Sequence, residues 1–247
     1  MSDLCYAPLI RDMTWSFSRV SSFDSCPYRW FLHYIKGKRE DDTFYASYGS
    51  FMHRILARYY AGEIERDGLA MEFLTGFRKE VKGMRPAAST VEKYVKEGAE
   101  YLRHPFTPEG KVLGVEMEVK FSVEGIPFVG FIDLVTREGG GIVLTDHKSR
   151  VIKSEAEARE MMKQLYLYSA AVFEETGEFP SRLRFNCFRD GKVIEIPFDP
   201  DEYAQSIRWV SDTIRKIESS EDFDPNPDWF RCRYLCGFRD FCGEWEG

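Results

Sequence analysis

The 247-residue chain has no stretch that approaches the ~20 consecutive apolar residues of a membrane-spanning helix. Its first residues, Met1-Ser2-Asp3-Leu4, do not open a secretory signal peptide. It also lacks Gly-x-x-x-x-Gly-Lys-Ser/Thr, the nucleotide-binding loop that helicases carry. No internal repeat or low-complexity tract is present. These absences predict a soluble, cytoplasmic protein with no membrane partner and no unwinding motor of its own.

Basic residues are in the minority, with 34 Lys and Arg against 41 Asp and Glu, and the net charge is −7. Proteins that bind nucleic acid without regard to sequence usually have a basic surface, so this composition argues mildly against that class. A local basic groove, or acidic residues gathered around a metal ion, is compatible with it. Because 43% of the residues are hydrophobic, the chain can bury a full core. We expect residues 1–247 to form one domain.

Hydrophobic periodicity predicts a definite order of helices and strands. Helices are expected in two pieces over 16–62, from the capping-box residue Ser89 to about His104, over 154–177, and from Pro200 to about Ile217. Strands are expected as a meander over 112–123, 127–136 and 142–148, and as a hairpin over 182–189 and 192–198. This order predicts an α/β fold with a mixed central sheet. A mainly helical part over 14–110 would precede a core over 111–219 and a cysteine-rich tail over 220–247.

Two acidic residues lie in apolar segments that predict buried strands. Asp133 is preceded by Phe131-Ile132, and Asp146 follows Val143-Leu144-Thr145 and precedes Lys148 by two residues. Because alternate side chains of a strand share a face, Asp146 and Lys148 point the same way. Charged groups are seldom fully buried unless they are paired or bind a metal. An ordinary salt bridge at a strand end and a site for a divalent metal and a phosphate ester both satisfy this pattern.

The residue types suit metal-assisted hydrolysis. The carboxylates of Asp133 and Asp146 are hard oxygen ligands of the kind that Mg²⁺ and Mn²⁺ prefer. Such an ion lowers the pKa of bound water and neutralises charge on a phosphodiester. Lys148 would orient the attacking water or stabilise developing negative charge.

Three further residues, His53, Gln164 and Tyr168, indicate a functional site only when they are considered together. His53, on an expected helix, is by itself more typical of a hydrogen-bonded core histidine than of a metal ligand. Gln164 and Tyr168 share one face of the long helix expected over 154–177. Taken alone, Tyr168 would be a core residue and Gln164 a surface residue.

Three of the six cysteines, Cys232, Cys236 and Cys242, are clustered in the tail, and Cys26 lies far upstream before a proline. A disulfide framework is not expected in a leaderless chain of this size. The paired Cys-x-x-Cys knuckles of ordinary zinc modules are missing. Three clustered thiolates need a distant fourth ligand, which suits an iron–sulfur cluster that joins the two chain ends. Zinc stays an alternative, and the remaining Cys5 and Cys187 are expected to be structural.

In this order and spacing, the motifs resemble those of the RecB-like exonucleases of the PD-(D/E)XK superfamily, over most of the chain. The iron–sulfur branch is the most similar; it includes CRISPR-associated RecB-like exonucleases, AddB-type nuclease domains and stand-alone phage homologues. The matching segments are Cys26-Pro27 for the N-terminal entry, Gly49-x-x-x-His53 for motif I, Gly130-Phe131-Ile132-Asp133 for motif II, Asp146-His147-Lys148 for motif III and Gln164-x-x-x-Tyr168 for the Gln-x-x-x-Tyr motif. Three residues separate Cys232 from Cys236, where many members have two.

The resemblance implies a restriction-endonuclease-like core and a role for each matching residue. The implied ligands of Mg or Mn are His53, Asp133, Asp146 and the backbone carbonyl of His147. Lys148 would be the catalytic lysine, and Gln164 and Tyr168 would help to position DNA and the active site. The implied ligands of a [4Fe-4S] cluster are Cys26, Cys232, Cys236 and Cys242. For Glu116 and Glu118, the favoured expectation is a solvated strand face, and the alternative is that one of them faces the metal pocket.

These observations leave three hypotheses. The first is a metal-dependent DNA exonuclease acting on single strands or DNA ends in recombination, repair, phage replication or CRISPR adaptation, with a helicase, an integrase or a recombination protein as partner. The second is a non-catalytic subunit of the same fold that binds DNA ends or docks a partner. The third is a nuclease held together by zinc. Aromatic and basic residues over 15–39 could stack bases and track phosphates, although core packing is favoured for these aromatics.

Overall fold

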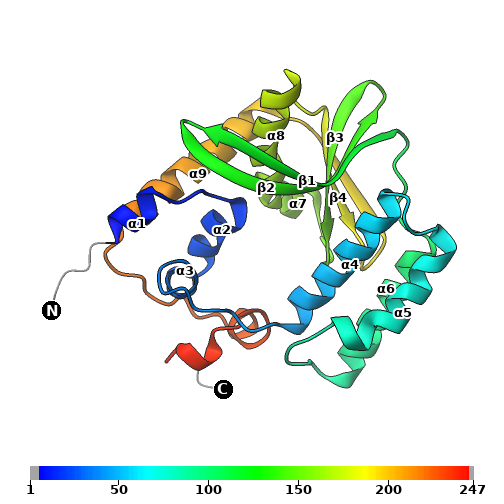
Figure 1. Ribbon diagram of the computed structural model, residues 1–247, viewed down its shortest axis with the longest axis horizontal. Helices are drawn as coiled ribbons and strands as arrows, with labels where there is room; N and C mark the ends of the chain where they lie inside the picture. Colours follow the sequence, from blue (N-terminus) through cyan, green and yellow to red (C-terminus); the bar gives the residue numbers. More distant parts are fainter. Residues whose placement is uncertain (1–5, 245–247) are drawn as a thin grey trace.

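A computed structural model describes residues 6–244 (Figure 1). Its helices are α1 (Ala7–Arg11), α2 (Phe17–Ser25), α3 (Pro27–Tyr34), α4 (Phe44–Tyr60), α5 (Arg66–Glu80), α6 (Ala88–Arg103), α7 (Glu155–Met161), α8 (Lys163–Thr176) and α9 (Pro200–Glu218). Its strands are β1 (Lys111–Val123), β2 (Ile126–Glu138), β3 (Gly141–Lys148), β4 (Arg182–Cys187) and β5 (Lys192–Pro197). Two short turns, η1 (Arg231–Leu235) and η2 (Arg239–Phe241), lie in the tail. Among these residues, no helix is long and apolar enough to cross a membrane.

The five strands form one sheet in the order β1-β2-β3-β4-β5. Neighbouring strands are antiparallel except β3 and β4, which are parallel. A parallel pair needs a long crossover, and α7 with α8 provides it. Helix α8 packs on β1 and β3, and α4 packs on β1 and β2. The predicted α/β fold with a mixed sheet is therefore confirmed, including the meander and the hairpin.

The helix expected at the start of the 16–62 segment is divided at Cys26. Ser16 caps α2 by accepting a hydrogen bond from the backbone N–H of Arg19. Pro27 then begins α3, because proline has no N–H for a continuing helix and its φ suits a first helical position. The break leaves Cys26 at the junction of two helices. The long helix expected over 154–177 is likewise divided, at Met162, whose N–H bonds to the carbonyl of Arg159 in a tight turn.

Two predictions about the helical part were wrong or incomplete. The capping box at Ser89 does not form, since α6 begins at Ala88 and its N-cap, Ala87, makes no side-chain cap. Helix α5 has no counterpart among the predicted elements. Its buried residues Leu69, Phe73 and Phe77 recur every four positions, a helical signal that the sequence offers.

The aromatic residues of the N-terminal region are in the core. Trp15, Phe23 and Trp30 are each at most 2% exposed and pack in a cluster with the sheet, α8 and α9. Trp15 also extends the sheet, because its N–H donates to the carbonyl of Pro127 and its carbonyl accepts from Val129. A second cluster fills the space between α4, α5 and α6. The core packing favoured for these N-terminal aromatics is what the structure shows.

Candidate active site

Three carboxylates lie side by side on neighbouring strands: Glu116 on β1, Asp133 on β2 and Asp146 on β3. The register places them together, because the pairs on either side of Asp133 are Met117 with Ile132 and Leu134 with Thr145. The register of β1 shifts between Val112 and Gly114. Just beyond it, Glu116 has a φ of 46°, a left-handed value that is uncommon for a residue other than glycine. This irregularity gives Glu116 a backbone direction that the regular strand would not.

His53 projects from α4 onto this row of carboxylates. Its Nδ1 lies 3.4 Å from Asp133 Oδ1 and 3.9 Å from Glu116 Oε1. Ligand atoms of His53, Glu116 and Asp133 all lie within 4.8 Å of one another. The three residues are therefore close enough to share one metal ion.

The two sides of His147 face different surroundings. Its carbonyl oxygen lies 2.8 Å from Nε2 of His53, at the site. Its imidazole is buried, with Nδ1 3.0 Å from the amide nitrogen of Asn186 and the ring centroid 5.6 Å from that of His53. The backbone N–H of His147 donates to Asp133 Oδ2 at 2.6 Å. The geometry thus offers the carbonyl oxygen, not the ring, to a group bound beside His53.

Asp146 and Lys148 form a largely buried ion pair. Lys148 Nζ lies 2.7 Å from Asp146 Oδ2, and the two side chains are 20% and 8% exposed. This oxygen of Asp146 nevertheless has no hydrogen-bond donor in good alignment. Lys148 Nζ also donates to Gln164 Oε1, at 3.4 Å. The ammonium of Lys148 thus offsets the charge of this buried carboxylate and is held in place by Asp146 and Gln164.

Tyr168 packs so closely on β2 that only glycine fits at position 130. A Cβ atom on Gly130 would lie 2.4 Å from the ring of Tyr168 and 2.8 Å from its hydroxyl. Gln164 and Tyr168 are one turn apart on α8 and face β3 and β2. The structure therefore brings His53, Asp133, Asp146, Lys148, Gln164 and Tyr168 to one place, together with the carbonyl of His147.

Crowding of charge shifts the ionisation of this site. Burial alone would lower the pKa of His53, but the hydrogen bond and charge of Asp133, helped by Asp146 and Glu116, raise it to about 9. Burial would raise the pKa of Asp133, yet His53 lowers it to about 2. Burial raises the pKa of Asp146 and outweighs the attraction of Lys148. A protonated His53 compensates part of the carboxylate charge, and a divalent cation is suited to take the place of that proton.

The combination of Asp133 on one strand with Asp146-x-Lys148 on the next decides the family. Residues 14–243 match the family model of the PD-(D/E)XK nuclease superfamily. The chain belongs to this superfamily. Phosphodiester hydrolysis is the chemistry that this membership implies, and the carboxylate and histidine donors suit the divalent metal that PD-(D/E)XK nucleases use.

Two solved structures are similar to this chain at low sequence identity. A candidate exonuclease from Eubacterium rectale is 13% identical, with 92% of this chain and 88% of that chain covered and a TM-score of 0.52. The structure of SSO0001 is 16% identical, with 80% of this chain and 97% of that chain covered and a TM-score of 0.34. No match is found among curated proteins. The likeness to the first structure supports the PD-(D/E)XK fold alone.

Glu116 faces this PD-(D/E)XK site, against the favoured expectation for it but in agreement with the alternative that one of Glu116 and Glu118 faces the metal pocket. Regular alternation assigns both Glu116 and Glu118 to a solvated face, and Glu118 does lie there, 3.0 Å from Lys120. Glu116 turns toward His53 instead, and burial followed by the charge of Asp133 raises its pKa. The only signal in the sequence is Gly114, since glycine within a strand often marks a bulge.

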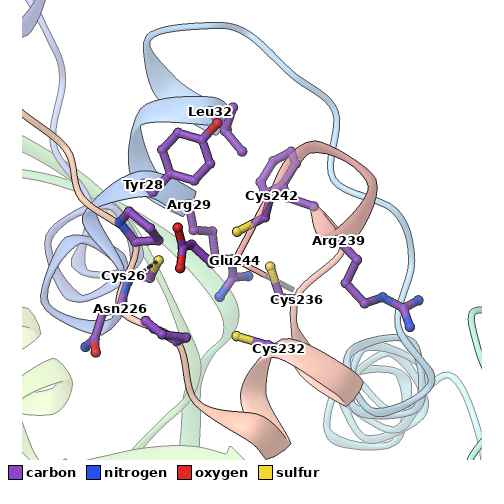
Figure 2. A pocket seen from close by; sticks show the side chains of 13 residues that line it. Cys26, Tyr28, Arg29, Leu32, Asn226, Cys232, Cys236, Arg239, Cys242 and Glu244 are labelled. Carbon is purple, nitrogen blue, oxygen red and sulfur yellow. Dashed lines mark hydrogen bonds between the residues drawn. The ribbon is translucent and has the colours of Figure 1, made fainter. Parts of the chain in front are cut away.

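The four predicted cluster cysteines line one pocket, formed by the start of α3 and the C-terminal tail. Figure 2 shows the sulfur atoms of Cys26, Cys232, Cys236 and Cys242 directed toward a common space. None of them forms a disulfide. Backbone N–H groups approach two of the sulfurs, from Asn226 to Cys26 at 3.5 Å and from Asp228 to Cys232 at 3.4 Å. A set of thiols that converge with N–H donors suits a metal-containing group.

Contacts outside the thiols hold the tail in place. Glu40 pairs with Arg29 at 2.8 Å and accepts from the N–H of Gly237 at 3.0 Å. A Cβ on Gly237 would lie 2.2 Å from the carbonyl oxygen of Asp41, so the two backbones need glycine at this point. Cys187 is fully buried on β4, as expected of a structural residue, whereas Cys5 lies outside the described residues.

In the metal-free protein, we expect the imidazole of His53 to titrate near pH 9 and that of His147 near pH 4. Asp133→Asn removes the charge that holds the proton on His53, so the pKa of His53 should fall by about one unit or more. Proton NMR of the histidine rings measures both values. Glu118→Gln is the matched control, because it removes one carboxylate of β1 that does not face His53. An ordinary pKa for His53 in the unaltered protein would contradict the observed geometry.

Proposed function

We propose that this protein is a divalent-metal-dependent DNA exonuclease that hydrolyses phosphodiester bonds at single strands or DNA ends. The observation that carries the proposal is the convergence of His53, Asp133 and Asp146 with the ammonium group of Lys148. The fold shared with the candidate exonuclease from Eubacterium rectale is consistent with it. A row of carboxylates across three neighbouring strands beside one lysine is not needed for stability, since replacing a buried ion pair by apolar packing is often neutral or stabilising.

In this proposal, Mg²⁺ or Mn²⁺ is held by His53, Asp133, Asp146 and the carbonyl oxygen of His147. Glu116 is a further oxygen donor within reach. The bound ion would supply Lewis acidity and a water of lowered pKa. The rest of the chemistry belongs to the side chains that surround it.

Lys148 provides the fixed positive charge of the site. Asp146 and Gln164 hold its Nζ from two sides, so the ammonium is already oriented before a substrate arrives. Such a preorganised donor stabilises the charge that develops on the phosphate oxygens and orients the attacking water. Gln164 and Tyr168 act as positioning residues, with Tyr168 kept against β2 by its contact with Gly130.

The cleft beside the carboxylates is open and partly basic. It is lined on α4 by Tyr45, Gly49, His53, Arg54 and Arg58, among other residues. Arg54 is ion-paired with Glu80 and Arg58 with Glu72, so these glutamates offset part of the positive charge that the two arginines bring to the cleft.

For the cysteines, we propose a [4Fe-4S] cluster held by Cys26, Cys232, Cys236 and Cys242, as in the iron–sulfur branch of RecB-like nucleases. It would join α3 to the C-terminal tail, whose residues are about 200 positions apart in the chain. A zinc ion on the same four thiolates is the alternative. A helicase, an integrase or a recombination protein is the proposed partner, in repair, recombination, phage replication or CRISPR adaptation.

Lys148→Ala and Asp146→Ala should each lower Mg²⁺- or Mn²⁺-dependent cleavage of labelled single-stranded and duplex DNA by about a hundred-fold or more, because each removes a group placed at the reacting phosphate. Gel assays of product length against time measure the loss and distinguish exonuclease from endonuclease action. Glu118→Ala is the control, and circular dichroism verifies folding. If both variants cut DNA as fast as the unaltered protein, the assignment is wrong. If the unaltered protein binds DNA ends but does not cut DNA with any divalent metal, the non-catalytic alternative holds.

Anaerobically purified protein should be brown, absorb near ~400 nm and contain iron rather than zinc. Cys26→Ala should remove most of the iron, because Cys26 is the ligand that no neighbouring cysteine can replace. Cys187→Ala is the matched control, since it deletes a buried thiol outside the pocket. Elemental analysis decides the matter: zinc in place of iron supports the alternative, and metal content unchanged by Cys26→Ala overturns the four-cysteine site.

A further inference from the structure

An exposed group of aromatic rings lies where the cysteine-rich tail meets the active-site cleft. Trp229 and Phe230 are 66% and 47% exposed, which is unusual for side chains of this size. Both rings pack against Tyr234 of η1, at centroid distances of 5.9 and 5.3 Å. We call Tyr45, Trp229, Phe230 and Tyr234 the aromatic platform.

Tyr45 joins the platform to the cleft. Its ring lies 5.9 Å from Phe230 and 6.1 Å from Tyr234. It also lines the cleft that contains His53 and Glu116. Figure 1 shows the C-terminal segment, in red, beside the end of α4 that begins with Phe44. The platform and the active site are therefore two ends of one continuous surface.

Three arginines lie close to the platform in the chain and form no ion pair with any residue that the structure describes. Residues 229–239 contain three arginines, Arg231, Arg233 and Arg239, and no acidic residue. Within the described part of the chain, none of the three forms an ion pair, unlike Arg54 and Arg58 in the cleft. The guanidinium of Arg233 lies 5.8 Å from the ring centre of Trp229 and 5.6 Å from that of Tyr234. Aromatic faces beside unpaired arginines are the pattern that recognises unpaired bases and their phosphates.

The spacing along α4 suits a short strand. Tyr45 and His53 are eight residues apart, or roughly 12 Å along a helix that rises about 1.5 Å per residue. That length corresponds to about three or four stacked nucleotides at about 3.4 Å each. A nucleic-acid strand whose bases stack on Phe230 and Tyr45 would thus reach the carboxylates with its backbone about three or four nucleotides further along.

We propose that the aromatic platform is a binding site for single-stranded nucleic acid that feeds the strand end to the active site. The inference rests on the proposed nuclease function and narrows its substrate, because bases paired within a duplex cannot present their faces to Trp229 and Phe230. The platform is part of the cysteine-rich tail, so the group proposed for the thiols would also fix the position of the rings. Loss of that group should therefore weaken strand binding as well as fold stability.

The test compares binding of an oligothymidylate of about 12 nucleotides, a typical single-strand site size, with binding of an abasic strand of equal length. Fluorescence anisotropy is measured on the intact protein without added divalent metal, so that the strand is not cut. Trp229→Ala and Phe230→Ala should each weaken oligothymidylate binding about five-fold or more, the usual effect of one stacking ring. Abasic strand should bind the unaltered protein weakly, and the two substitutions should not weaken it further.

Two controls separate stacking from general damage. Trp229→Phe keeps an aromatic face and should retain affinity within about two-fold. Phe173→Ala removes a ring of similar exposure, 44%, on α8, away from the cleft, and should leave binding unchanged. If the unaltered protein binds both strands equally, and neither Trp229→Ala nor Phe230→Ala changes this binding, the proposal for the platform is wrong. Cleavage of DNA by the unaltered protein would still support the nuclease proposal in that case.

Two other results would also overturn the inference. If Trp229→Ala abolishes self-association in sedimentation but leaves strand binding unchanged, the rings contact a second copy of the chain instead. If the unaltered protein neither binds nor cuts any strand, the nuclease proposal fails and the platform fails with it. If Trp229→Ala and Phe230→Ala each remove the preference for oligothymidylate over the abasic strand, the aromatic platform is supported.

Discussion

The repulsion among Glu116, Asp133 and Asp146 is the interaction on which the candidate site depends. Strand register brings these carboxylates together at neighbouring positions of the sheet. Packing of the hydrophobic core does not require acidic residues at these positions. Two cations offset the charge: Lys148 beside Asp146, and His53 on α4 with its pKa raised to about 9. A site that needs a proton on a histidine for compensation is prepared to exchange that proton for a divalent cation. This excess of negative charge is what suits the site to the divalent metal that PD-(D/E)XK nucleases use.

A second constraint is the closure of the chain on itself. Pro27 ends α2 and leaves Cys26 at a helix junction, where the tail returns with its three cysteines. Glu40 and Gly237 add a charge-assisted hydrogen bond and a close backbone approach to this closure. In the proposed function, the thiol-bound group makes the closure permanent. In the proposal for the aromatic platform, this closure would also serve strand binding, because the tail that closes the chain places Phe230 beside Tyr45.

Much of the fold could be predicted from the sequence because its strands have strong periodicity and its turns carry strong signals, such as Asp190-Gly191. Helix α5 was missed because Gly68, Gly76 and charged residues weaken its pattern. The break at Cys26 could have been inferred from Pro27. The direction of the Glu116 side chain toward His53 could not be inferred in the same way. The alternation of inward and outward side chains assumes a regular strand, and the bulge near Gly114 interrupts that regularity. The aromatic platform depends on contacts between Tyr45 and residues near position 230, which no local pattern reveals.

The most direct test of the account is a crystal structure of the protein grown with Mn²⁺, in which anomalous scattering locates the ion. The account predicts a peak within about 2.0–2.2 Å of carboxylate oxygens of Asp133 and Asp146, with the imidazole of His53 and the carbonyl of His147 completing the ligands. The absence of Mn²⁺ from this position in well-ordered crystals, or its binding only elsewhere on the surface, would contradict the central claim.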